Sequence, residues 1–113
     1  MALPRTNLAI RAGDEKTWTV TIKDDAGSTV NIAGATLSWK IAEGKDATAD
    51  ITKTNGSGIA ITDGPNGVLT LTLDEADTAS LVGDYYHEIQ AVDGSGVTQT
   101  MLRGTLRIER TLH

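Results

Sequence analysis

The stretch VLTLTLDEADTASLVGDYYHEIQAV, residues 68–92, decides the expected fold of this 113-residue chain. Within residues 68–73, three leucines alternate with threonines, which is the period of a half-buried β-strand. Asp74 then has the position of a helix N-cap, and Asp77 follows three residues later. The sequence therefore predicts a strand followed by one short helical turn, which we expect to end at Gly83.

A longer strand is predicted after this turn, with Tyr85, His87 and Ile89 on its inner face. A short helix followed by Gly-x-Tyr is similar to the tyrosine corner of immunoglobulin-like sandwiches, in which the tyrosine hydroxyl bonds to nearby backbone. We expect the Tyr85 hydroxyl to bond to the backbone of residues 77–80. His87 occupies the position of the second cysteine of such domains, so no disulfide is expected.

The rest of the chain reads as short strands separated by turns rich in Gly, Asn and Asp. The 55–58 and 93–96 segments have the composition of hairpin turns, and Gly104 predicts a bulge or a close neighbour inside the last strand. Further strands are predicted at residues 7–11, 15–23, 35–42, 50–54, 59–62 and 97–109. The predicted fold is all-β: an immunoglobulin-like antiparallel β-sandwich of seven to eight strands with one short helical turn. One domain, 7–113, would follow an N-terminal arm, 1–6, that contains Pro4.

The composition excludes several classes of function. A net charge of −5 argues against nucleic acid as a partner, because a phosphate backbone requires a positive protein surface. The absence of cysteine excludes disulfides and thiolate metal sites. No apolar run reaches the length of a membrane span, and the N-terminus lacks the layout of a secretion signal. We therefore expect a protein without membrane or nucleic-acid partners.

The search for catalytic chemistry is negative. His87 and His113 are the two histidines, and the sequence contains no nucleophile elbow, phosphate loop or dinucleotide fingerprint. The glycine-rich segments join strand to strand, so hairpin turns account for them. The expectation is that the protein is not an enzyme and holds no cofactor or metal.

Three alternatives to purely structural roles remain open. Loop aspartates could supply oxygen ligands to calcium if the loops converge, although solvated turn aspartates are the simpler interpretation. His87 beside Glu88 could act in acid–base chemistry, but neighbours on a strand point to opposite faces, which favours a core histidine. Trp18 and Trp39 could form a platform for sugar, but their alternation places both in the core. The aspartates concerned are Asp24 and Asp25 together with Asp63 or Asp93.

Five segments carry a resemblance to a known family. They are IRAGDEKTWTVTI (10–22), NIAGATLSWKI (31–41), ITKTNGSGIAITDGPNGVLTLTL (51–73), DTASLVGDYYHEIQAVD (77–93) and GTLRIE (104–109). Their order resembles the immunoglobulin-like domain at the N-terminus of phage baseplate upper proteins and small stand-alone phage virion proteins of the same build. The resemblance covers residues 8–109, and its motifs are structural.

This resemblance implies a non-enzymatic structural component of a phage particle that acts by protein–protein docking. A tail or baseplate accessory protein and a capsid cement or decoration protein are both consistent with it. The implied partners are other virion structural proteins and further copies of the chain. The implied location is the virion, after synthesis in the host cytoplasm. The alternative is a carbohydrate-binding or host-adhesion module displayed on the virion.

The sequence offers two sets of candidate contact residues. Arg5 in the arm and Met101, Arg103 and Arg107, expected on the outer face of the last strand, are candidates for docking. Tyr86 points away from the predicted core and is the candidate for ligand contact. An outward aromatic residue would favour the adhesion alternative.

Overall fold

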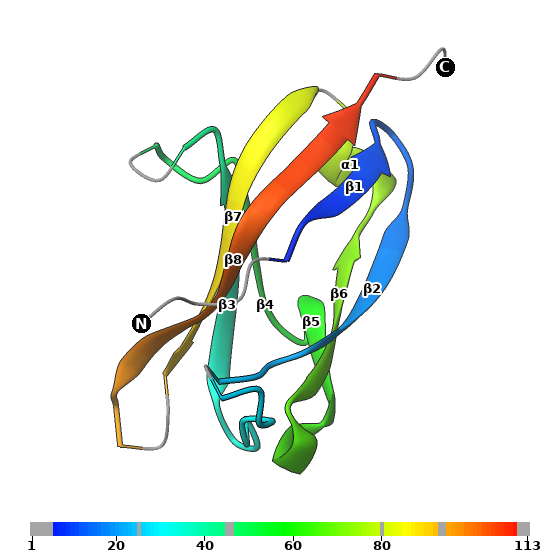
Figure 1. Cartoon of the computed structure of the whole chain (residues 1–113). Helices are drawn as coiled ribbons and strands as arrows, with labels where there is room; N and C mark the ends of the chain where they lie inside the picture. Colours follow the sequence, from blue (N-terminus) through cyan, green and yellow to red (C-terminus); the bar gives the residue numbers. More distant parts are fainter. Residues whose placement is uncertain (1–5, 25, 45–46, 80, 93–94, 111–113) are drawn as a thin grey trace.

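The computed structural model describes residues 6–24, 26–44, 47–79, 81–92 and 95–110. Eight strands are hydrogen-bonded in the order β1-β8-β7-β3-β4-β5-β6-β2, and they form two facing layers (Figure 1). One layer contains β1 (Leu8–Arg11), β8 (Thr98–Glu109), β7 (Gly83–Val92), β3 (Thr36–Ala42) and β4 (Ile51–Asn55). The other contains β5 (Gly58–Asp63), β6 (Val68–Leu73) and β2 (Lys16–Thr21). A 3₁₀ turn, η1 (Gly64–Asn66), and a short helix, α1 (Glu75–Thr78), complete the secondary structure of the described residues.

The strand order is that of an immunoglobulin-like sandwich. Strands β2, β6 and β5 take the places of strands B, E and D, while β3, β7 and β8 take those of C, F and G. The predicted all-β immunoglobulin-like fold, with eight strands and one short helix, is confirmed. No helix among the described residues has the length and apolar character needed to cross a membrane.

The sandwich is mixed and not antiparallel throughout, which corrects the prediction. Strand β1 runs parallel to β8, and β4 meets β5 in a short parallel pairing at residues 54–59. The 55–58 segment does contain a tight turn, because Thr54 and Ser57 exchange two backbone hydrogen bonds (3.2 and 2.9 Å), but no antiparallel ladder of β4 and β5 follows it. The chain passes there from one layer to the other. Asn55 explains the departure, because its side chain accepts a hydrogen bond from Leu37 N (2.7 Å) and donates one to Ala35 O (2.9 Å). These two bonds satisfy backbone groups at the start of β3, where β4 turns away from β3.

The short helix begins as predicted and ends earlier. Asp74 and Asp77 form a reciprocal capping box, with the Asp74 N–H donating to Asp77 Oδ2 at 2.9 Å. The helix ends at Thr78, and its C-cap, Ala79, is right-handed, so Gly83 does not cap it. Gly83 instead begins β7 with φ of 120°. The buried Thr78 hydroxyl accepts a hydrogen bond from Gly13 N, which attaches the helix to the turn after β1.

The core lies between the two layers and is formed by the alternating faces that the sequence predicts. Trp39 and Leu71 are fully buried, and Trp18 is half-buried against them. The ring centroids of Trp18 and Trp39 lie 6.2 Å apart in an edge-to-face contact, and His87 contacts Trp39 in the same way at 6.1 Å. This aromatic row joins β2, β3 and β7, the region in which antibody domains have a tryptophan packed on a disulfide.

The last residue of the predicted arm is attached to the sandwich. Thr6 donates its N–H to Arg103 O at 2.9 Å, and its carbonyl lies 2.7 Å from His87 Nε2. The close neighbour predicted for Gly104 is this segment, since a Cβ at Gly104 would collide with the Thr6 carbonyl. Residues 1–5, including Arg5, lie outside the described residues.

The tyrosine corner is present with a different partner. The Tyr85 ring is buried, but its hydroxyl donates to Val82 O at 3.5 Å and not to the backbone of residues 77–79, while Ser80 lies outside the described residues. Because this bond is long, we expect Tyr85→Phe to lower the free energy of unfolding by only about 0.5 kcal/mol or less. Urea unfolding of the two proteins tests the value. A loss of about 2 kcal/mol would mean that the hydroxyl has a stronger partner in solution.

Candidate functional site

The outer face of the larger layer gathers polar residues from three adjacent strands. On β7, Glu88 lies opposite Lys40 of β3 and opposite Arg103 of β8, and Tyr86 is two residues before it. We call these four residues the Tyr86 face. Their strand neighbours Trp39, His87 and Ile89 are fully buried, so alternation directs the four side chains away from the core. Tyr86 and Arg103, which the sequence assigns to two different candidate sites, therefore belong to one surface.

The Tyr86 hydroxyl is part of this charged group. It donates a hydrogen bond to Glu88 Oε2 at 3.2 Å. Partial burial and the negative charge of Glu88 raise the pKa of Tyr86, and the positive charge of Arg103 opposes them. The hydroxyl thus remains a hydrogen-bond donor at neutral pH.

A hollow of about 370 Å³ lies beside Tyr86. Small residues of the segment that follows β3 form much of its wall. The charged side chains come from Lys40 of β3 and Glu88 of β7. The lining residues are Lys40, Ala42, Gly44, Ala47, Thr48, Ala49, Tyr86 and Glu88. An aromatic ring, a carboxylate and an ammonium group around a shallow hollow can bind a polar ligand, but they do not form a nucleophile–base pair.

Two further predicted docking residues, Arg107 and Met101, are not part of the Tyr86 face. Arg107 is exposed, and its Nε donates to Asp84 Oδ1 at 3.1 Å, so it forms a solvent-exposed ion pair. Met101 is the extra residue of a β-bulge, since Ile89 pairs with Leu102 and Gln90 with Thr100. Because of this extra residue, its side chain packs against the core, and the prediction that Met101 lies on the outer face is wrong. Arg103, which belongs to the Tyr86 face, is half-buried, and its Nε makes no hydrogen bond to the part of the chain that the structure describes.

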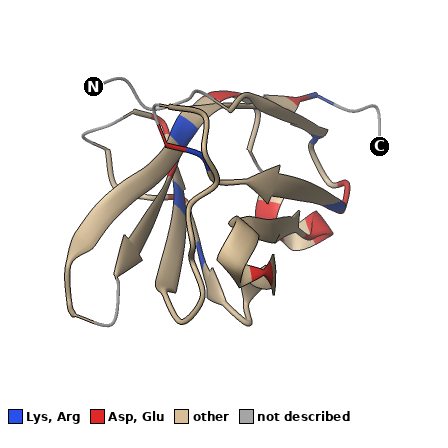
Figure 2. Cartoon of the chain, turned by 60° about the horizontal axis from the view of Figure 1, so that its bottom comes forward, with Lys and Arg blue, Asp and Glu red and all other residues tan. Residues whose placement is uncertain are grey.

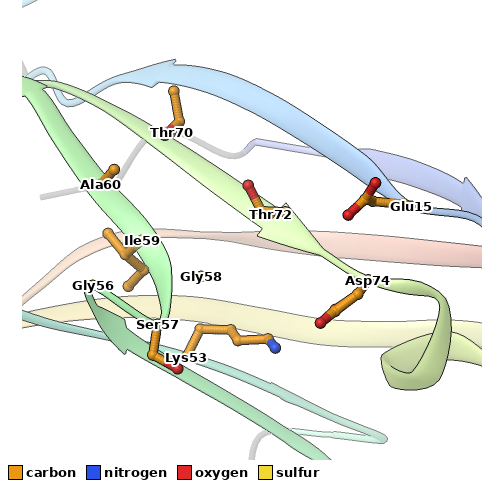
Figure 3. Close-up of a pocket in the computed structure, with 10 residues that line it drawn as sticks. All are labelled: Glu15, Lys53, Gly56, Ser57, Gly58, Ile59, Ala60, Thr70, Thr72 and Asp74. Atoms are coloured by element: carbon orange, nitrogen blue, oxygen red, sulfur yellow. The ribbon is translucent and has the colours of Figure 1, made fainter.

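A second hollow, of about 380 Å³, lies between β4, β5 and β6 (Figure 3). Its basic residue, Lys53, forms an ion pair with Asp77 of α1 at 2.8 Å, and both side chains are largely buried. Burial alone would raise the pKa of Asp77, but hydrogen bonds from Lys53 and Asp74 outweigh it and lower that pKa. Lys53 therefore attaches the helix to β4, and this hollow offers no uncommitted cation among the described residues.

The loop aspartates are accounted for by their own turns. Asp24 Oδ1 accepts hydrogen bonds from Ala26 N and Ser28 N, each at 3.0 Å. Asp63 Oδ2 accepts one from Asn66 Nδ2 at 2.9 Å. The other two aspartates of the calcium alternative, Asp25 and Asp93, lie outside the described residues, and the described ones include no cluster of three metal-binding side chains.

His87 is a core residue, as strand alternation favours. It is fully buried, and both ring nitrogens have partners. Trp39 Nε1, which can only donate, bonds to His87 Nδ1 at 3.0 Å, so the proton lies on Nε2 and is donated to Thr6 O. Burial lowers the pKa of His87 more strongly than the Thr6 bond raises it. The neutral ring is a structural connector between the core and Thr6.

The Lys and Arg positions of the described chain are spread over several strands and loops and do not gather on one element (Figure 2). This distribution agrees with the acidic net charge of −5. It gives no support to a nucleic-acid interface, for which basic residues must gather on one face.

The fold and the Tyr86 face define the chain as an immunoglobulin-like β-sandwich domain with a polar candidate binding surface. No protein-family model matches it, and no curated protein matches its sequence. Among solved structures it is similar to AggA, the major subunit of aggregative adherence fimbriae type I from Escherichia coli. The identity is 13%, the match covers 93% of this chain and 89% of that chain, and the TM-score is 0.36. So distant a likeness carries no argument about function.

Proposed function

We propose that this chain is a non-enzymatic binding module whose ligand-contacting surface is the Tyr86 face, with carbohydrate as the ligand class. The observation that carries this proposal is the position of Tyr86 beside a hollow of about 370 Å³ that also contains Lys40 and Glu88. Such a module would serve adhesion to a glycan-bearing surface.

The chemistry of the hollow suits a neutral, hydroxyl-rich ligand. The phenol ring offers an apolar face, and Glu88 and Lys40 offer an acceptor and a donor. Because the two charges have opposite signs, neither an anion nor a cation is favoured by the hollow as a whole. A sugar ring can use both polar groups and stack its C–H face on the aromatic ring.

The test is glycan-array screening of the purified protein, followed by calorimetry of any ligand found. We expect Tyr86→Ala to weaken binding roughly tenfold or more, because aromatic anchors dominate such sites. The matched control is Arg107→Ala, which removes an exposed side chain from the neighbouring strand and should leave affinity unchanged. Binding that survives Tyr86→Ala, or the lack of any bound glycan, contradicts the proposal.

A second candidate function is a structural component of a phage particle, as the resemblance over residues 8–109 implies. In that setting the Tyr86 face would dock on a neighbouring virion protein, in the tail, the baseplate or the capsid. Half-buried Arg103 and Tyr86 are residue types that are enriched at protein interfaces. Incorporation of the chain into particles, with Arg103→Glu reducing its occupancy and Arg107→Glu leaving it unchanged, would support this candidate over the first.

A further inference from the structure

Strand β2 is one of the two ends of the strand order, and no strand among the described residues pairs with its outer edge. Its one strand neighbour among the described residues is β6, whereas the other end of the order is β1, a strand of four residues. The β1 edge is partly covered, because Lys16 Nζ reaches Ala9 O at 3.5 Å. An exposed edge of six residues is a template for pairing with another strand.

The hydrogen bonds between β2 and β6 show which backbone N–H and C=O groups of β2 lie at its outer edge. Ile22 donates its N–H to Gly67 O at 2.8 Å, so this pair is hydrogen-bonded, and such pairs alternate along an antiparallel ladder. The backbone groups of Thr17, Thr19 and Thr21 therefore point away from β6. The 2.9 Å contact between the hydroxyls of Thr17 and Thr72 agrees, because side chains approach most closely in pairs that are not hydrogen-bonded.

We propose that β2 pairs antiparallel with β2 of a second copy of this chain about a two-fold axis at Thr19. In this register Thr19 faces Thr19 of the second copy, and Thr17 faces Thr21 in both directions. All three outward-pointing threonines then exchange backbone hydrogen bonds. The two three-stranded layers join into one continuous sheet.

Charge complementarity selects the second copy as the occupant. The register that centres on Thr19 places Glu15 of one copy opposite Lys23 of the other, and the symmetry makes this pair twice. Both side chains are exposed, and each residue is two positions beyond a threonine at one end of β2, so continued strand alternation places both on the threonine face. Neither forms an ion pair with a described residue of its own chain. A shift of two residues in either direction would separate Glu15 from Lys23, so the charges also specify the register.

The absence of native cysteine allows a direct test of the register. In a hydrogen-bonded pair the Cα atoms lie about 5.5 Å apart, a distance that a disulfide spans. Thr19→Cys should therefore form a covalent dimer under mild oxidation. Thr17→Cys is the matched control, because its symmetry copy would lie about 13 Å away along the partner strand. A mixture of Thr17→Cys and Thr21→Cys proteins should cross-link as a heterodimer.

Charge reversal tests the same pairing without oxidation. Sedimentation equilibrium should show a dimer that Glu15→Lys or Lys23→Glu weakens roughly tenfold and that the double variant restores. Glu43→Lys and Arg110→Glu, at exposed positions outside the strands, should leave the dimer unchanged. A monomer at every concentration, cross-linking of Thr17→Cys to itself, or a double variant as weak as the single ones would overturn the proposal.

Discussion

Replacing Trp39 by alanine is expected to lower the free energy of unfolding by about 3–5 kcal/mol, the largest loss of any single change considered for this protein. The side chain is fully buried between the layers and contacts Trp18 and His87 edge to face. Its removal leaves a cavity and also deprives buried His87 Nδ1 of its hydrogen-bond donor. Denaturant titration measures the effect directly. For a domain of this size the loss approaches the whole stability.

The matched control for this prediction is Trp18→Phe. Trp18 lies at the other end of the aromatic row, is only half-buried, and makes no side-chain hydrogen bond in the described structure. We expect a loss of less than about 1.5 kcal/mol, because the substitution keeps an aromatic ring at the site. A loss for Trp18→Phe as large as that for Trp39→Ala would contradict the placement of Trp39, and not Trp18, at the centre of the core.

Acidification is expected to destabilise the protein through His87. Burial lowers the pKa of the folded ring below the usual 6.5, so the folded protein resists protonation while the unfolded chain accepts a proton. The free energy of unfolding should therefore fall as the pH drops below 6.5, by up to about 1.4 kcal/mol per pH unit. The loss continues until the pH reaches the lowered pKa of the folded state.

Urea unfolding at pH values from 7.5 to about 5 measures this slope. The range stays above the ordinary aspartate pKa of about 3.9. The pKa of Asp77 is lowered further in the folded protein, so its contribution to stability is lost only at more acidic pH. In His87→Phe the slope over the same range should be much smaller, although the variant is less stable at every pH. A wild-type slope that persists in His87→Phe would assign the proton uptake to another group.

The Tyr86 face could be predicted from the sequence only in part. Strand alternation placed Tyr86 and Arg103 on outer faces, because a period of two follows from backbone geometry. It could not bring them together, because the distance between residues 86 and 103 depends on the register of β7 against β8. The bulge at Met101 could not be predicted from strand alternation either, because one extra residue in a strand leaves no clear signal in the amino-acid composition.

The inner faces of the strands, the capping box at α1 and the all-β class could be predicted from the amino-acid sequence. Each of these depends on neighbours within a few residues, so local periodicity and capping preferences predict them. Three features could not be predicted in this way: β1 runs parallel to β8, the 55–58 turn crosses between the layers, and Thr6 bonds to His87. The β1–β8 and Thr6–His87 contacts join residues far apart along the chain, and the crossing at 55–58 depends on the bonds of Asn55 to Ala35 and Leu37. They arise because buried polar groups such as His87 Nε2 must find partners wherever packing places them.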